Sequence, residues 1–120
     1  MVSDFRFEEA FIEKWNAHFS DKKIEEFWQL DEDLSEFVYE MLDIKEYSQI
    51  GGYGYFTQTD PRMYDSLSDY TEILFQLDSY DEGDEYKILW GDCGVGSFFA
   101  TKEQLKNLDF ANCLYNWDCC

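Results

Sequence analysis

The chain has 120 residues, the length of one domain, and a formal net charge of −18 at pH 7 from 27 acidic and 9 basic residues. A charge of this sign predicts attraction to basic surfaces and argues against direct binding to nucleic acid or to anionic membranes. Hydrophobic residues make up 45% of the chain and aromatic residues 20%, which excludes a wholly disordered protein and permits a sizeable core.

Neither a membrane span nor an export signal is predicted. No apolar run approaches the ~20 residues of a membrane helix, and the first residues lead directly into an acidic stretch. We therefore expect a cytoplasmic protein. The four cysteines, two of them adjacent at positions 119 and 120, do not form a disulfide framework and are expected to be free thiols.

Residues 1–46 are predicted to be helical. The apolar residues at positions 7–19 fall close to one helical face. A later amphipathic stretch follows the spacing i, i+3, i+4, i+7, i+8 through Leu34, Phe37, Val38, Met41 and Leu42. Either Asp31 or Asp33 is suited to cap its N-terminus. This region holds 14 acids against 5 bases, so its exposed face is strongly negative.

The remainder is predicted to consist mainly of strands and turns. Ile73, Phe75 and Leu77 alternate with their neighbours, which is typical of a mostly buried strand. Thr101 is a candidate N-cap for a short helix at 102–108. The other expected strands and turns are an apolar block at 50–56 that ends before Pro61, a polar hairpin loop at 81–84, a strand at 86–90, a turn at 91–94, a strand at 95–100 and a closing strand around 114–117.

This order of elements predicts an α+β fold, with N-terminal acidic helices packed on a C-terminal antiparallel sheet. We expect a single domain over residues 1–120, with a helical region at about 1–46 and a strand-rich region at about 47–120.

Four sequence blocks carry a family resemblance. They are GGYGYFTQTDPR at 51–62, LFQLD at 74–78, WGDCGVGSFF at 90–99 and LYNWD at 114–118. In this order they resemble the YwqG-like family, a bacterial family of uncharacterised function. The resemblance covers residues from about 51 to the end. Members are usually longer, so it implies that this chain corresponds to the C-terminal part of one.

The chain departs from the family pattern near the first block. Members commonly carry a His just before the Gly-Gly pair and a Pro inside it, where this chain has Ser48 and Gly54. Because the other half of a longer member is missing, we hypothesise that self-association replaces it, which would make the protein a homodimer.

No catalytic set can be assembled from the sequence. His18, the only histidine, lies beside an apolar stripe and is expected to be structural or exposed. The cysteines lack a C-x-x-C pair for zinc. The carboxylate-rich loop at 78–85 does not match a calcium loop, and the glycines at 51–54 lack the lysine of a phosphate loop. We therefore expect no catalytic residue, no metal and no cofactor.

The leading functional hypothesis is a non-enzymatic interaction protein that binds a basic partner, as immunity proteins, anti-defence inhibitors and nucleic-acid mimics do. Carboxylates spaced along helices can replace a row of phosphates, so the expected partner is a nuclease or another nucleic-acid-binding protein. The candidate contacts are the acids Glu25, Glu26, Asp31, Glu32, Glu36, Glu40 and Asp43.

The alternative hypothesis is a small-ligand-binding module or enzyme with a groove built from the family blocks. Within it, Arg62 is expected to pair with a buried carboxylate such as Asp92, either as a structural lock or in ligand binding. The candidate residues are Tyr53, Gln58, Asp60, Arg62, Trp90, Asp92 and Trp117.

Overall fold

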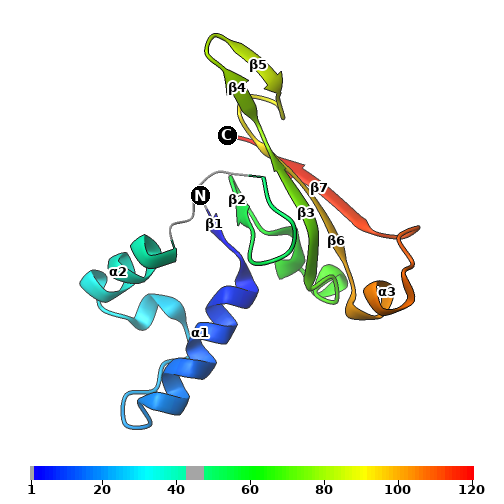
Figure 1. Ribbon diagram of the computed structural model, residues 1–120. Coiled ribbons are helices and arrows are strands. Elements are labelled where there is room, and N and C mark those ends of the chain that lie inside the picture. Colours follow the sequence, from blue (N-terminus) through cyan, green and yellow to red (C-terminus); the bar gives the residue numbers. More distant parts are fainter. Residues whose placement is uncertain (1, 43–47) are drawn as a thin grey trace. The chain divides into compact units, whose positions relative to one another are not determined.

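The computed structural model describes residues 2–42 and 48–120. The chain divides into two compact units. The helical unit is Phe5–Lys45, and the sheet unit combines Met1–Asp4 with Glu46–Cys120. The predicted α+β class is confirmed, because helices dominate the first part of the chain and antiparallel strands the second (Figure 1).

The helical unit is built around a small aromatic core. Its elements are α1 (Phe5–His18), the 3₁₀ helix η1 (Phe27–Gln29) and α2 (Glu32–Leu42). Ile24, Phe27 and Leu30 are buried, and apolar side chains of α1 and α2 pack against them. The ring of Phe27 contacts that of Phe11 at 5.2 Å between centroids, so the connecting segment is anchored on α1.

Polar contacts fix the connection between the two helices. The Asn16 side chain accepts from the backbone N–H of Ile24 and donates to its carbonyl, both at 2.8 Å. The Asp31 carboxylate accepts from the N–H of Leu34 at 2.9 Å, so Asp31 is the N-cap of α2. One of the two predicted caps is thereby confirmed.

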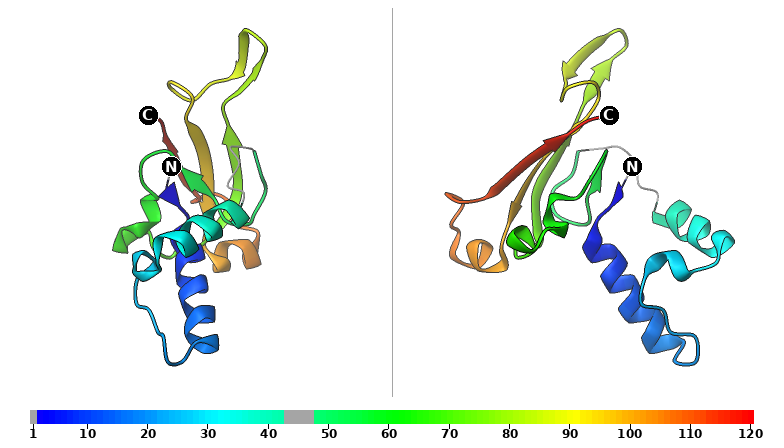
Figure 2. Two further views of the ribbon diagram at one scale, coloured as in Figure 1. Left: turned by 90° about the vertical axis from the view of Figure 1, so that its left-hand side faces the viewer. Right: turned by 180° about the vertical axis from the view of Figure 1, so that it is seen from behind.

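The sheet unit contains a three-stranded antiparallel sheet of order β3-β6-β7, which both figures show side by side (Figures 1 and 2). A short pair, β1-β2, and a hairpin, β4-β5, complete its strands. The bounds are β1 Val2–Ser3, β2 Tyr55–Phe56, η2 Pro61–Met63, η3 Asp65–Leu67, β3 Glu72–Asp78, β4 Tyr80–Glu82, β5 Glu85–Ile88, β6 Val95–Ala100, α3 Lys102–Asn107 and β7 Leu114–Asp118.

Several predicted elements of the second half are confirmed closely. β6 has the expected bounds, and β7 lies at the expected closing position. The Thr101 hydroxyl accepts from the N–H of Gln104 at 3.1 Å, which makes Thr101 the N-cap of α3. The apolar block at 50–56 yields only the two-residue strand β2, because Gly51 and Gly52 have φ values of +69° and +76°, which a strand does not allow.

Several expectations are wrong in detail. Asp81 and Glu82 belong to strand β4 and not to the predicted hairpin loop, and β5 ends at Ile88 and not at residue 90. Residues 2–3 form strand β1, paired with β2, where a helix was predicted. In β3 a register shift between Ile73 and Phe75 moves Phe75 off the predicted buried face. Phe75 is 40% exposed, whereas Gln76 is 1% exposed in its place.

The buried Gln76 is accommodated because its amide is fully engaged. Its Nε2 donates to the carbonyl of Tyr55 at 2.8 Å and to the hydroxyl of Ser97 at 2.9 Å, and its Oε1 accepts from the N–H of Tyr55 at 3.2 Å. These bonds tie β2 to the inner face of the sheet, beside the core of Phe56, Ile73 and Phe99. None of the helices in the described part of the chain has the length and apolar character needed to span a bilayer.

Candidate functional site

One concentration of charge without a base on its own element lies on α2. Its sequence, EDLSEFVYEML, has four acids and no base. Glu32, Glu36 and Glu40 stand four residues apart, so they lie on one face about 6 Å apart along the axis. All three are exposed and line one shallow hollow together with Ser35 and Tyr39.

This arrangement is unfavourable for the isolated helix. Like charges at i, i+4 each cost a few tenths of a kcal/mol. Glu32 lies in the first turn, where the helix dipole favours an acid, but Glu40 lies near the C-terminus, where it does not. Folding therefore gives no reason for this row of acids, and a binding role would supply one.

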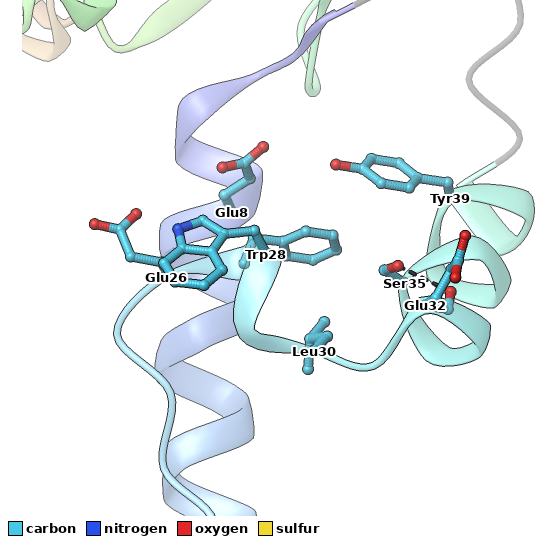
Figure 3. Close-up of a pocket in the computed structure, with 8 residues that line it drawn as sticks. Glu8, Glu26, Trp28, Leu30, Glu32, Ser35 and Tyr39 are labelled. Atoms are coloured by element: carbon cyan, nitrogen blue, oxygen red, sulfur yellow. Dashed lines mark hydrogen bonds between the residues drawn. The ribbon is translucent and has the colours of Figure 1, made fainter.

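A groove opens beside this row (Figure 3). Its volume is about 530 Å³, and every residue that lines it belongs to the helical unit. In the close-up, Trp28, Glu26 and Glu8 stand on one side and residues of α2 on the other, with Leu30 on the connecting loop below. The lining residues are Glu8, Glu26, Phe27, Trp28, Leu30, Glu32, Ser35 and Tyr39.

The groove combines an aromatic interior with acidic edges. Phe27 is buried, and its ring lies 5.2 Å from that of Tyr39. Trp28 follows Phe27 in the single turn of η1 and is 78% exposed, the most exposed tryptophan or tyrosine side chain of the described residues. Because adjacent residues of a tight turn point in different directions, burying Phe27 in the core leaves Trp28 at the surface.

The structure divides the acids predicted as partner contacts into three groups. Glu26 and Glu32 line the groove, and Glu36 and Glu40 continue from it along α2. Glu25 is exposed outside both hollows, and the Asp31 carboxylate is engaged as a helix cap. Asp43 lies outside the described residues.

Of the eight residues that line the groove, the sequence identified only Glu26 and Glu32 as contacts; the six that were missed include Glu8, Trp28 and Tyr39. In the sequence, Trp28 stands with Ile24 and Phe27 in a short apolar stretch that suggests a buried residue, and Glu8 belongs to a different helix from the other acids. The available signal for Trp28 was its position next to Phe27 in a stretch too short to bury both. Only the tertiary contact of Tyr39 with Phe27 identifies Tyr39.

The alternative set of site residues contains two that no ligand at the surface can reach. Asp60 and Arg62 are both 0% exposed. Arg62 donates from Nε and Nη2 to the two Asp60 carboxylate oxygens at 2.9 and 2.8 Å, and its Nη2 lies 2.9 Å from Asp4 Oδ2. Arg62 thus pairs with buried carboxylates, as expected, but the choice of Asp92 was wrong, since Asp92 is exposed in the turn at 91–94.

Burial alone would lower the pKa of the Arg62 guanidinium, but its bonds and attraction to Asp60 and Asp4 outweigh that effect and raise it. The guanidinium carbon also lies 4.6 Å from the ring centre of Phe99 and 5.5 Å from that of Phe56. Arg62 is therefore a permanent interior cation. It acts as a structural lock, which is one of the two roles that the sequence allowed.

The other five residues of that set are spread over the sheet unit. The Gln58 side chain donates to the carbonyls of Cys119 and Cys120 at 2.8 and 2.9 Å. Trp90 covers Gly96, where an added Cβ would lie 2.5 Å from the indole. Trp117, which is 47% exposed, lies next to Gly91, and Tyr53 is half exposed. Gln58 and Trp117 thus belong to the region around the C-terminal residues, apart from the buried ion pair.

The cysteines are free thiols, as predicted. Within residues 2–42 and 48–120, no group of three or more His, Cys, Asp or Glu side chains is placed to hold a metal ion.

Residues 1–119 match the model of one protein family, described as a domain of unknown function (DUF1963). The chain belongs to this family. The DUF1963 match includes the helical unit, so the expected restriction of the resemblance to the C-terminal part of a member is not confirmed. A search of curated proteins gave no match.

Proposed function

We propose that this DUF1963 protein is a non-enzymatic interaction module that binds a basic protein through its helical unit. The single observation that carries the proposal is the row Glu32, Glu36 and Glu40 on α2, which has no base on its own helix and adjoins an acid-edged groove. The expected roles are those of an inhibitor, an immunity protein or an anti-defence protein.

The electrostatics favour a partner that itself binds nucleic acid. A net charge of −18 attracts a positive surface over several ångströms and accelerates association. Carboxylates repeated along a helix present the partner with acceptors in a row, as phosphates do. A nuclease or another nucleic-acid-binding protein has a surface suited to such a row.

We place the protein in the YwqG-like part of the family on the four sequence blocks at 51–62, 74–78, 90–99 and 114–118. In this proposal the blocks specify the sheet unit, and the acids of the helical unit bind the partner. We also propose a cytoplasmic location, where the four free thiols would remain reduced.

The test is affinity capture of the tagged protein from a lysate at low and high salt, read by mass spectrometry. The proposal predicts one dominant basic protein whose recovery falls steeply as salt rises, because exposed charge pairs are screened. Recovery of no protein, or of one whose binding is insensitive to salt, would contradict it.

A ligand-binding face on the sheet unit is the second candidate. The observation in its favour is a continuous aromatic row across three strands, in which the Phe98 ring lies 4.8 Å from both Phe75 and Tyr115. Trp117 extends this partly exposed surface. Under this alternative, Trp117→Ala abolishes binding of a small ligand, whereas acid reversals on α2 leave it unchanged.

A further inference from the structure

We propose that the groove of the helical unit holds an arginine side chain of the basic partner, with its guanidinium against Trp28 and Tyr39 and within reach of the glutamates at the edge. This inference rests on the proposed function and adds to it the chemical group that is recognised. The groove residues that carry it are Glu26, Phe27, Trp28, Glu32 and Tyr39.

The occupant must be cationic and partly apolar. The edge carries the carboxylates of Glu26 and Glu32, and the chain as a whole is strongly negative, so an anionic or neutral polar group would be disfavoured. The interior presents the rings of Phe27 and Tyr39 and the aliphatic side chain of Leu30, which suit methylene groups. A long basic side chain combines both properties.

Arginine fits this site better than lysine does. Its planar guanidinium stacks on an aromatic face while its N–H groups donate to carboxylates in the plane of the fork. A lysine ammonium is a compact, strongly hydrated charge that does not stack. Trp28 offers the preferred ring for a cation, and at 78% exposure most of its surface is open to a partner.

Figure 3 shows that the required groups come from different elements. Glu26 and Trp28 stand on the connecting segment and Glu32 and Tyr39 on α2, across the groove from them. An arginine between them would contact an aromatic side chain and a carboxylate from each side. The groove volume of about 530 Å³ accommodates one such side chain with adjoining residues of the partner.

The test compares nona-arginine and nona-lysine peptides, which have equal length and equal net charge, by calorimetric titration of the full chain. The wild type is expected to bind nona-arginine about five- to tenfold more tightly than nona-lysine. Trp28→Ala should remove this preference. The variant should still bind both peptides, because the substitution leaves the net charge unchanged. Glu26→Gln should reduce the preference by about half or more.

Phe37→Ala is the matched control. Phe37 is an exposed aromatic residue of α2, at 55% exposure, and it does not line the groove. This variant should keep the wild-type preference. Circular dichroism of each variant establishes that its helices are retained.

The outcomes separate this inference from the proposed function. Equal affinity of the wild type for the two peptides, or an equal loss in Phe37→Ala, would overturn the arginine site and leave the acidic module standing. Failure of both peptides to bind would overturn both. Self-association of the wild type that Trp28→Ala abolishes would mean that a second copy fills the groove, and this would also overturn the inference.

Discussion

The guanidinium of Arg62 lies 2.9 Å from the carboxylate of Asp4, and both side chains are completely buried. Asp4 directly follows strand β1, and its carboxylate also accepts from the N–H of Gly54 at 3.0 Å. Through these contacts one interior charge cluster joins the first residues of the chain to the segments before β2 and around η2. The fold of the sheet unit therefore depends on a buried ion pair that joins its N-terminal residues to the 3₁₀ helix η2.

Arg62→Met is expected to lower the free energy of unfolding by about 3–5 kcal/mol, because it leaves two buried carboxylates, Asp4 and Asp60, without their cation. Denaturant titration measures this loss. Lys87→Met, which removes an exposed ion pair with Glu85, is the control and should cost less than about 1 kcal/mol. Equal effects of the two variants would show that the interior cluster is hydrated and contributes little.

Gly94→Ala is expected to destabilise the sheet unit by about 3 kcal/mol or more. A Cβ at this buried position would collide with the backbone carbonyl of Asp118, so β7 would have to move. Gly54→Ala is the comparison, because there the nearest atom is the tip of the Ile73 side chain, which can rotate away. Thermal unfolding should show the larger loss for Gly94→Ala, and the reverse order would contradict the register of β7.

Glu36→Lys should stabilise the helical unit while weakening partner binding. The substitution replaces two like-charge pairs, with Glu32 and Glu40, by two attractive ones, which is worth about 0.5–1 kcal/mol. Hydrogen exchange of the α2 amides measures the stability, and capture of the partner measures the binding. A variant that is both more stable and equally active would show that this row has no role in recognition.

The hydroxyl of Tyr86 lies 2.9 Å from the sulfur of Cys93, and this hydrogen bond is the main cause that raises the pKa of the Tyr86 phenol above its ordinary value. A raised pKa means that the folded state holds this proton more tightly. The associated stability is therefore complete below the ordinary value of about 10 and is lost as pH rises above it. Tyr86→Phe should make the loss of stability above pH 10 less steep, as followed by denaturant titration at several pH values. An unchanged pH profile would contradict the assignment.

The sequence was sufficient to predict those strands, turns and caps that local patterns determine. The turn residues at 91–94, the strand that follows them at 95–100 and the Thr101 cap were predicted from nearby residues alone. It was insufficient at β3, where the register shift that buries Gln76 depends on the facing strand and on Tyr55 and Ser97. No pattern within residues 71–77 reveals such partners.

The acids of the candidate site were predicted from the sequence, but the groove beside them was not. The spacing of Glu32, Glu36 and Glu40 on one helix is a local property, and the sequence identified these acids. The groove depends on how η1 packs against α1 and α2, and this packing decides that Phe27 is buried while Trp28 remains exposed. One partner of Arg62, Asp4, was missed because it lies near the N-terminus, far from Arg62 in the sequence.

The proposed function requires that acids of the helical unit, and not net charge alone, bind the basic partner. The most direct test captures the partner with two variants of equal net charge. One reverses Glu26, Glu32, Glu36 and Glu40 to Lys, and the other reverses the exposed hairpin acids Asp81, Glu82, Asp84 and Glu85 to Lys. If these acids bind the partner, the first variant loses it and the second retains most of the wild-type recovery. Equal loss in both variants, or loss only with the hairpin variant, would contradict it.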